Sequence, residues 1–249
     1  MTDRFEFTQL NQLSEELHTS HYLYVPTDDE EKGKNRYDDI LPYRHTRITL
    51  GETGRYINAN RVLHTICTQA PLEHTIDDFW TMVWEQQASM IVMLTDTQPE
   101  KAIVYWPDLH QTWIGKSISV TTTQEVIHHG YILRILRMEM KTDRDHSIEV
   151  MHLQYHAWPD HGVPSPSELY PFVQLVERFR EQQPDGHPLL IHCSAGIGRT
   201  GTFLAILHAR QTEEAAIFPI VQEMRRQRMY MVQTFEQYQF IKTFCAEFQ

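Results

Sequence analysis

The feature that most constrains the fold lies in residues 188–207, where an apolar strand is followed closely by an apolar helix. Residues 188–192 predict a buried strand, and the apolar run at 203–207 predicts the helix. A short loop of mostly small residues joins the two and contains a cysteine and glycines. A strand that leads through a tight loop into a helix is typical of an α/β protein with helices packed on its sheet.

Other strands are predicted from apolar runs before residue 160. Every residue of 90–94 is apolar, which predicts a fully buried strand. Residues 116–156 contain apolar runs separated by turn-forming residues at 129–130 and 143–145, and this pattern predicts antiparallel hairpins. Together these strands are expected to form a mixed sheet with helices on its faces.

Helices are predicted at both ends of the chain, and the C-terminal half is expected to be the more helical one. Apolar residues recur at helical spacing over 7–18, and a further helix is expected near 219–228. In a capping box, two side chains three residues apart accept hydrogen bonds from backbone N–H groups of the first helical turn. This pattern predicts two more helix starts, Ser165 with Glu168 and Thr234 with Gln237. The charged run 28–34 is interpreted as a solvated loop.

Length and composition favour one domain. A chain of 249 residues, of which 41% are hydrophobic, can bury a core of moderate size, and no Pro/Gly/Ser-rich linker interrupts it. The expected fold is α/β, with a central twisted mixed sheet flanked by helices, in a single domain that spans residues 1–249. Residues 1–33 are expected to add an N-terminal helix and the charged loop to the same domain.

Charge, hydropathy and cysteine content exclude several classes of function. A formal net charge of −11 argues against nucleic acid or a membrane as the main partner, because these need a broad basic face. No run approaches the roughly 18 apolar residues that cross a bilayer, and the N-terminus lacks the pattern of an export leader. The three cysteines form no zinc-binding pair or disulfide framework, which predicts a reducing compartment, the cytoplasm.

The loop after the strand 188–192 carries the chemistry. Gly196 and Gly198 allow backbone angles that other residues avoid, so successive N–H groups can point inward and bind an anion. The N-terminus of the following helix strengthens this site, and Arg199 can form a planar two-pronged contact with two phosphate oxygens. The expected phosphate-binding residues are Ser194, Ala195, Gly196, Ile197, Gly198 and Arg199.

The same N–H dipoles would stabilise a thiolate at Cys193, and the Thr200 hydroxyl is expected to donate to its sulfur. Cys193 would then be a nucleophile placed under the phosphorus atom. The alternative is a buried core cysteine followed by glycines that only form turns. The complete pattern of a cysteine, five residues, an arginine and a threonine between strand and helix favours the nucleophile. No metal or cofactor is expected.

Residues 192–201 resemble the signature loop of the phosphotyrosine-specific protein tyrosine phosphatases. Other motifs of that family follow from about residue 34 to the end, namely KNRYDDILP at 34–42, YINAN at 56–60, TQAPL at 68–72, DFWTMVWE at 78–85, YWP at 105–107, WPDHGVP at 158–164 and VQTFEQY at 232–238. The resemblance implies the family's α/β fold. It also implies hydrolysis of phosphotyrosine in proteins through a cysteinyl-phosphate intermediate, without a metal or cofactor.

The resemblance implies two groups of catalytic residues. Asp160 matches the family's general acid, on a loop in which Trp158 and Pro159 serve as hinge and lever. Gln233 matches the glutamine that orients the attacking water, and Gln237 assists it. Asp160 would act as the base in this second step.

The resemblance also implies the residues around the substrate. Tyr37 would stack on the substrate ring and set the depth of the pocket, and Asp39 would accept hydrogen bonds from the substrate backbone. Arg36 and Lys101 are expected to belong to the same substrate site. His192 is expected to be a structural residue that precedes the nucleophile.

The chain departs from the family's pattern at several positions. Ala70 stands where the family usually has glycine, Arg55 where an acidic residue precedes YINA, and residues 229–230 where it has Pro-Gly. The connections at 60–68 and 96–101 are short. None of these differences removes a catalytic atom.

Three alternatives stay open from the sequence. The acidic partner of Lys101 is either Asp96 or Glu100. A pseudophosphatase that only binds phosphotyrosine usually lacks the acid or the recognition tyrosine, whereas Asp160 and Tyr37 are both present. A dual-specificity or lipid phosphatase shares the Cys-x5-Arg loop alone and would not need the recognition segment.

The expected partners follow from the same interpretation. They are phosphotyrosine-containing proteins, with no nucleic acid and no membrane contact required, and the chain is expected to be a monomer. Its compartment would be the cytoplasm, or the host cytosol if the protein is viral or bacterial. The individual substrate is not specified by the sequence.

Overall fold

The structure is a computed structural model that describes residues 2–19, 22–183, 186–211 and 216–248. In these ranges the strands form one mixed sheet in the order β1-β2-β3-β9-β4-β8-β7-β6-β5. The strands are β1 (Arg47–Leu50), β2 (Arg55–Val62), β3 (Thr65–Thr68), β4 (Met90–Met93), β5 (Thr112–Ile114), β6 (Ile118–Ile127), β7 (Tyr131–Met140), β8 (Asp143–Tyr155) and β9 (Leu189–His192). The predicted α/β fold with a central mixed sheet is confirmed.

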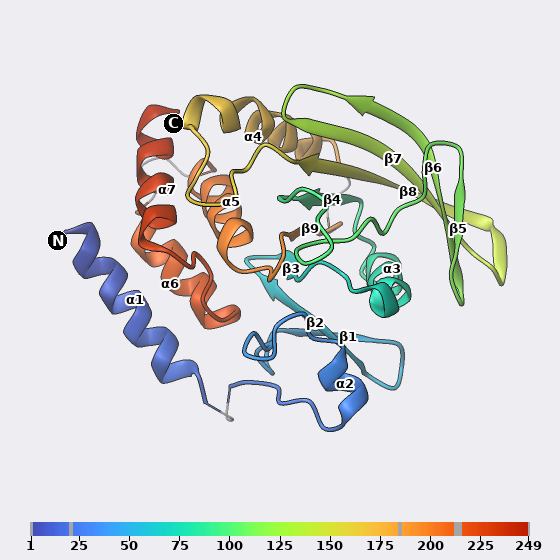
Figure 1. The fold of residues 1–249 in the computed structure, drawn as a ribbon, viewed down its shortest axis with the longest axis horizontal. Helices are drawn as coiled ribbons and strands as arrows, with labels where there is room; N and C mark the ends of the chain where they lie inside the picture. Colours follow the sequence, from blue (N-terminus) through green and yellow to red (C-terminus); the bar gives the residue numbers. More distant parts are fainter. Residues whose placement is uncertain (1, 20–21, 184–185, 212–215, 249) are drawn as a thin grey trace.

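Helices cover both faces of this sheet (Figure 1). They are α1 (Asp3–Leu17), α2 (Asp29–Gly33), α3 (Ile76–Glu85), α4 (Pro166–Glu181), α5 (Gly198–Ala209), α6 (Ile217–Gln227) and α7 (Phe235–Glu247), with a 3-10 turn η1 (Glu73–Thr75) before α3. Most of the helical residues follow residue 165, as predicted. Within the described ranges, no helix has the length and apolar character needed to span a membrane.

The centre of the sheet is parallel. β9 lies between β3 and β4, and β4 lies between β9 and β8, with every one of these pairs parallel. The carboxyl ends of parallel strands meet at one edge of a sheet, where open α/β proteins bind their ligands. The loop that begins at Cys193 therefore lies beside the chain segments that follow β3, β4 and β8.

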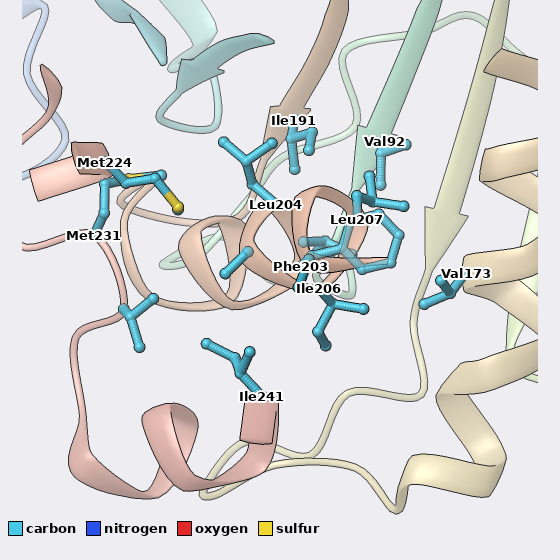
Figure 2. Close-up of a cluster of buried hydrophobic side chains, with 14 of the residues drawn as sticks. Val92, Val173, Ile191, Phe203, Leu204, Ile206, Leu207, Met224, Met231 and Ile241 are labelled. Atoms are coloured by element: carbon cyan, nitrogen blue, oxygen red, sulfur yellow. The ribbon is translucent and has the colours of Figure 1, made fainter. Parts of the chain in front are cut away.

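Alternate residues of the central strands pack on opposite faces. Ile191 of β9 belongs to the apolar cluster beneath α4, α5, α6 and α7, whereas Leu190 belongs to the cluster beneath α3. Figure 2 shows Ile191 and Val92 on the same side of the sheet as Leu204 and Leu207 of α5. The helix that follows the loop is thereby anchored on the strand that precedes it.

Most of the elements predicted from local patterns are present. The strand predicted at 90–94 is β4, and the helices predicted near 203–207 and 219–228 are α5 and α6. Both predicted capping boxes form, at the starts of α4 and α7, by Ser165 with Glu168 and by Thr234 with Gln237. The hairpins predicted within 116–156 are formed by β6, β7 and β8, which pair antiparallel.

Some boundaries differ from the prediction. The charged run 28–34 is not only a loop, because α2 forms within it. The Asp28 side chain accepts a hydrogen bond from the Glu31 N–H and caps this helix, and the acidic residues of its first turn favour the helix dipole. The turn predicted at 143–145 lies before these residues, which belong to β8.

The N-terminal helix starts at Asp3 rather than at residue 7, and it is tied to the C-terminal helices. Glu6 accepts hydrogen bonds from the Tyr238 hydroxyl at 2.6 Å and from Lys242 at 2.5 Å. The Arg225 guanidinium donates to the Asn11 side chain at 2.9 Å. α1 therefore packs on the same core as α6 and α7 (Figure 1).

The packing of α5 gives a test of this core. Phe203 is fully buried, and its ring centre lies 5.6 Å from that of Phe172 in α4. Replacement of Phe203 by alanine leaves a cavity, and we expect it to lower the free energy of unfolding by about 3–5 kcal/mol. Phe5 is 51% exposed, so Phe5→Ala is the matched control, with an expected change of less than about 0.5 kcal/mol. Urea unfolding measures the free energy of unfolding of both variants. Equal losses in the two would show that Phe203 is not part of the core.

Candidate active site

Cys193 follows β9 directly, and the residue is only 5% exposed. It lines a surface cavity of about 480 Å³ at the carboxyl edge of the parallel strands. The sequence-predicted residues that line this cavity are Tyr37, Asp39, Lys101, Asp160, Cys193, Ser194, Ala195, Ile197, Gly198, Arg199, Gln233 and Gln237. Those that do not line it are Arg36, Trp158, Pro159, His192, Gly196 and Thr200.

Gly196 gives the loop its tight path. Its φ is +71°, and a Cβ atom built on it would lie 2.1 Å from the Thr68 carbonyl oxygen of β3. Only glycine satisfies both constraints. Gly198 was expected to need a similar backbone angle, but its φ is not positive. A Cβ atom there would lie 3.1 Å from side-chain atoms of Gln233 and Gln237, so a larger residue at 198 would press on these two glutamines.

Arg228 holds the loop from below, and sequence reasoning missed this role. The side chain is fully buried and donates to the carbonyl oxygens of Gly196 at 2.8 Å and Ala195 at 3.1 Å. It also donates to the side-chain oxygens of Asn58 and Asn60 in β2, at 2.9 and 2.7 Å. The C=O and N–H of one peptide unit point in opposite directions. Arg228 therefore turns the loop carbonyls away from the cavity side.

Thr200 does not form the hydrogen bond expected of it. Its hydroxyl oxygen is buried and has no hydrogen-bond partner among the described residues, so it does not donate to the Cys193 sulfur. The neighbouring Thr202 hydroxyl instead donates to the Gly198 carbonyl within α5, at 2.9 Å. The loop backbone and the start of α5 are thus the groups of this loop that surround Cys193.

Arg199, in the first turn of α5, joins the loop between β9 and α5 to two other loops. One guanidinium nitrogen donates to the Leu94 carbonyl at 3.3 Å, and the other donates to the Pro159 carbonyl at 3.0 Å. The guanidinium carbon lies 6.0 Å from the centre of the Trp158 ring. Trp158 and Pro159 therefore contact Arg199 and carry the next residue, Asp160, to the cavity.

Asp160 is paired with Lys101 across the cavity rim. The Lys101 Nζ atom lies 2.5 Å from Asp160 Oδ1. The hydrogen bond from Lys101 and its charge lower the pKa of the Asp160 carboxyl. The acidic partner of Lys101 left open between Asp96 and Glu100 is thus Asp160 in the structure. The Asp96 side chain accepts instead from the Thr97 N–H at 2.8 Å.

Tyr37 lines the cavity and is tied to the loop that begins at Cys193. Its hydroxyl lies 2.9 Å from the Ser194 hydroxyl, which itself donates to the Lys101 carbonyl at 2.8 Å. Ser194 has used its one proton, so Tyr37 is the donor to Ser194. Asp39 is exposed beside it on the cavity wall. Tyr37 and Asp39 therefore both belong to the lining of the cavity.

Arg36 lies outside the cavity and connects neighbouring segments. Its guanidinium donates to the carbonyls of Ala70 and Pro71, at 3.2 and 2.8 Å, and to that of Glu100 at 3.4 Å. Its backbone N–H donates to the Gln69 side chain at 2.9 Å. Arg36 thus holds the segment of Tyr37 against the chain that follows β3.

Six further residues that line the cavity were missed by sequence reasoning. They are Ile40, Thr95, His161, Gly162, Thr234 and Glu236. The Glu236 carboxylate would lie 3.0 Å from a Cβ on Gly162, so α7 and the loop of Asp160 meet there. Ile40, His161, Thr234 and Glu236 each adjoin a predicted site residue in the sequence, and this adjacency is the signal that could have found them. Gln237 accepts from the Gln233 N–H at 2.9 Å, which fixes the start of α7.

Comparison with known protein families gives a direct match. The family model described as protein-tyrosine phosphatase matches residues 31–247. The chain is 41% identical over 232 residues to the tyrosine-protein phosphatase Lar-like of Caenorhabditis elegans, which covers 86% of this chain and 10% of that protein. It is 40% identical over 240 residues to the tyrosine-protein phosphatase non-receptor type 20 of Rattus norvegicus, covering 87% of this chain and 56% of that protein.

Solved structures agree over nearly the whole chain. The catalytic domain of human protein tyrosine phosphatase non-receptor type 18 superimposes with a TM-score of 0.87 at 32% identity, covering 98% of this chain and 95% of that one. A structure of PTPN18 in complex with HER2-pY1196 phosphor-peptides gives a TM-score of 0.88 at 31% identity, with 99% and 92% covered. The chain spans less than two thirds of the length of each of the two sequence relatives above.

The pair of Lys101 and Asp160 gives a test of the site's electrostatics. Lys101→Met removes the hydrogen bond and the positive charge that favour the carboxylate, so we expect the pKa of Asp160 to rise toward its ordinary value. A carbon-13 NMR titration of the aspartate carboxyl groups measures this pKa. Lys32→Met removes an exposed lysine paired with Asp29 and is the control. An unchanged or lower pKa for Asp160 in Lys101→Met would show that the pair does not persist in solution.

Proposed function

This chain belongs to the protein-tyrosine phosphatase family, and from that membership we propose that it hydrolyses phosphotyrosine in proteins through a cysteinyl phosphate on Cys193. The observation that carries the proposal is the position of Cys193 in the cavity. It lies at the start of a glycine-containing loop that enters a helix, with an arginine on one side and Asp160 at the rim.

The first step is attack by the Cys193 thiolate on phosphorus. A sulfur–phosphorus bond forms as the bond between phosphorus and the tyrosine oxygen breaks. The leaving phenolate takes a proton from the Asp160 carboxyl, which becomes a carboxylate. Arg199 and the loop N–H groups bear the charge on the three remaining phosphate oxygens. These groups are already held in place, by Pro159 and Leu94 for Arg199 and by Arg228 for the loop.

The second step releases phosphate. A water oriented by Gln233, with help from Gln237, attacks phosphorus, and the Asp160 carboxylate takes the water proton. The sulfur–phosphorus bond breaks and Cys193 returns to the thiolate. Gln233 and Gln237 support this role because both line the cavity and both pack against Gly198. The mechanism uses no metal or cofactor.

Phosphotyrosine is the substrate that fits the cavity rim best. Tyr37 is fixed by its hydrogen bond to Ser194 above the loop, so it can pack on an aromatic ring whose phosphate reaches Cys193. A dual-specificity phosphatase would not need a tyrosine at the position of Tyr37. A pseudophosphatase is not favoured either, because Asp160 and Arg199 line the same cavity as the cysteine.

The partners are proposed to be phosphotyrosine-containing proteins. Support comes from PTPN18, a structural relative solved in complex with HER2-pY1196 phosphor-peptides. We also propose a reducing compartment, the cytoplasm, because the nucleophile must stay a thiol and the cysteines 67, 193 and 245 are all unpaired. The monomeric state stays a prediction, which light scattering of the purified chain would check.

The covalent step is tested by Cys193→Ser. A hydroxyl is a much weaker nucleophile than a thiolate at neutral pH, so turnover of a phosphotyrosine peptide should fall below about a hundredth of the wild-type rate. Peptide binding should persist, since the loop backbone and Arg199 are unchanged. Stopped assays of released phosphate and a fluorescence binding titration measure the two properties. Turnover close to the wild-type rate would exclude the cysteinyl intermediate.

The general acid is tested by a pH series. The wild-type kcat/KM should follow a bell with its maximum on the acidic side of neutrality, because Asp160 must be protonated while Cys193 must be ionised. Lys101 lowers the pKa of Asp160, so the alkaline limb should begin at low pH and move upward in Lys101→Met. Asp160→Ala should remove that limb and lower kcat by about two to four orders of magnitude.

The control for this series is Asp29→Ala. The Asp29 side chain is 99% exposed in α2, so its removal should leave the whole profile unchanged. A profile that Asp160→Ala does not alter would show that another group is the acid. Negligible wild-type turnover at every pH, with tight peptide binding, would instead identify a binding module.

A further inference from the structure

A chain of buried polar side chains leads from Cys193 into the sheet. His192 Nδ1 lies 3.1 Å from the Cys193 carbonyl oxygen, and His192 Nε2 lies 2.7 Å from the Tyr105 hydroxyl. The same hydroxyl lies 2.9 Å from His152 Nε2, and His152 Nδ1 lies 3.5 Å from a guanidinium nitrogen of Arg134. Each of the four residues linked to Cys193 is at most 5% exposed.

The two ends of this chain fix the direction of its hydrogen bonds. Burial lowers the pKa of His192 to about 4 and that of His152 well below its usual value, so both imidazoles are neutral at pH 7 and carry one N–H each. The Cys193 carbonyl can only accept, and the Arg134 guanidinium can only donate. The proton of His192 is therefore on Nδ1.

The remaining protons follow in order. His192 Nε2 must accept, so the Tyr105 hydroxyl donates to it. With its one proton used, the Tyr105 oxygen accepts from His152 Nε2–H. His152 Nδ1 is then an acceptor and faces the donor Arg134. One arrangement satisfies every group, and it runs without interruption from Arg134 to the carbonyl of Cys193.

We infer that Arg134, which lies outside the active-site cavity, is a positioning residue for the nucleophile and acts by fixing the tautomers of His152 and His192. The inference deepens the proposed function and rests on it in taking Cys193 as the nucleophile. The peptide unit that carries the Cys193 carbonyl also carries the Ser194 N–H, which points the opposite way. A donor held on the carbonyl thus helps to keep that N–H directed toward the anion site.

Arg134 is itself held in place by three contacts, of which those with Glu125 and Gln154 are on the sheet. Its Nε donates to the Glu125 carboxylate at 2.7 Å, and a terminal nitrogen donates to the Gln154 side chain at 3.0 Å. Its guanidinium carbon lies 4.4 Å from the centre of the Trp106 ring. Gln154 donates in turn to the Thr95 carbonyl at 3.3 Å. The donor that faces His152 is therefore rigid.

Without Arg134, the direction of the hydrogen bonds that link His152, Tyr105 and His192 can reverse. His152 can then carry its proton on Nδ1 and accept from Tyr105 at Nε2. Tyr105 would accept from His192 Nε2–H, and His192 Nδ1 would turn a lone pair toward the Cys193 carbonyl. The peptide would lose a hydrogen bond and meet a repulsive group, and the thiolate would lose a favourable dipole. The Cys193 thiolate should therefore be less stabilised than in the wild type.

Other groups that face these residues stay in place when Arg134 is changed. Arg228 and Cys67 interact with the Cys193 thiol electrostatically, and Arg36 interacts with His192. Arg199 lies on the cavity side of the same loop. None of them forms a hydrogen bond with Arg134 in the described part of the chain. Their contribution is thus constant between wild type and variant.

The wild-type tautomers can be tested without any substitution. Long-range proton–nitrogen NMR spectra of the whole chain with nitrogen-15-labelled histidine distinguish Nδ1–H from Nε2–H rings. The inference expects His192 as the Nδ1–H form and His152 as the Nε2–H form, neither titrating between pH 6 and pH 8. Single His→Asn variants assign the two signals. A His192 ring with its proton on Nε2 would overturn the inference, whatever the phosphatase activity of the protein.

The role of Arg134 is tested by Arg134→Met against a matched control on the same strand. Arg137 is half exposed and pairs with Glu139. Arg137→Met therefore removes an arginine of β7 that takes no part in the hydrogen bonds leading to Cys193. The readout is the pH midpoint for alkylation of Cys193 by iodoacetamide, followed by mass spectrometry of its peptide, which needs no turnover. Arg134→Met should raise this midpoint by about half a pH unit or more, and Arg137→Met should not.

Two further variants separate positioning from general stability. Arg134→Lys keeps a donor at this position and should restore the midpoint and the histidine tautomers at least in part. Tyr105→Phe already interrupts the hydrogen bonds between Arg134 and Cys193. Adding Arg134→Met to this variant should therefore not shift the pH midpoint of alkylation again. An additive shift in that background, or unchanged tautomers and midpoint in Arg134→Met, would overturn the inference while leaving the proposed hydrolysis intact.

Discussion

Much of the structure depends on one buried cation, the Arg228 guanidinium at the end of α6. A charge held in the protein interior costs several kcal/mol unless its donors are satisfied. Here the acceptors are oxygens of Asn58 and Asn60 in β2 and the carbonyls of Ala195 and Gly196. One side chain thus joins a strand, a C-terminal helix and the phosphate loop. Removal of Arg228 would leave these buried acceptors unpaired and the loop unsupported.

The parallel centre of the sheet makes this anchored loop into a site. Because β3, β9, β4 and β8 end at one edge, the segments that follow them meet there. Gly196 fits against the end of β3, Arg199 donates to the residue after β4, and the segment after β8 leads to Asp160. The spacing of the strands sets the distances between the loops that follow them. Residues far apart in the sequence therefore line one cavity.

The sequence predicted the parts of the site that are local in the chain. The loop 193–199 and the capping boxes depend on neighbours a few residues away, so they can be recognised from the sequence alone. Arg228 and Arg36 could not be predicted in the same way, because their carbonyl acceptors lie 32 and 34 residues away. The reason for Gly198 was also wrong, since the space it leaves for α7 exists only after folding. A pattern of charge likewise predicted exposure at 28–34 but not the short helix.

Charge explains how an acidic protein can bind phosphate. Arg199, Arg36 and Arg228 donate to carbonyl and amide oxygens, and in the described ranges none of them forms an ion pair with a carboxylate. Neutral acceptors satisfy hydrogen bonds without cancelling the charge, so these arginines keep their positive charge although the net charge of the chain is −11. Of the three, Arg199 lines the cavity, where its charge can act on a bound phosphate. Lys101 differs, because it pairs with Asp160. When Asp160 takes up the proton it needs as an acid, the charge of Lys101 is released toward the phosphate.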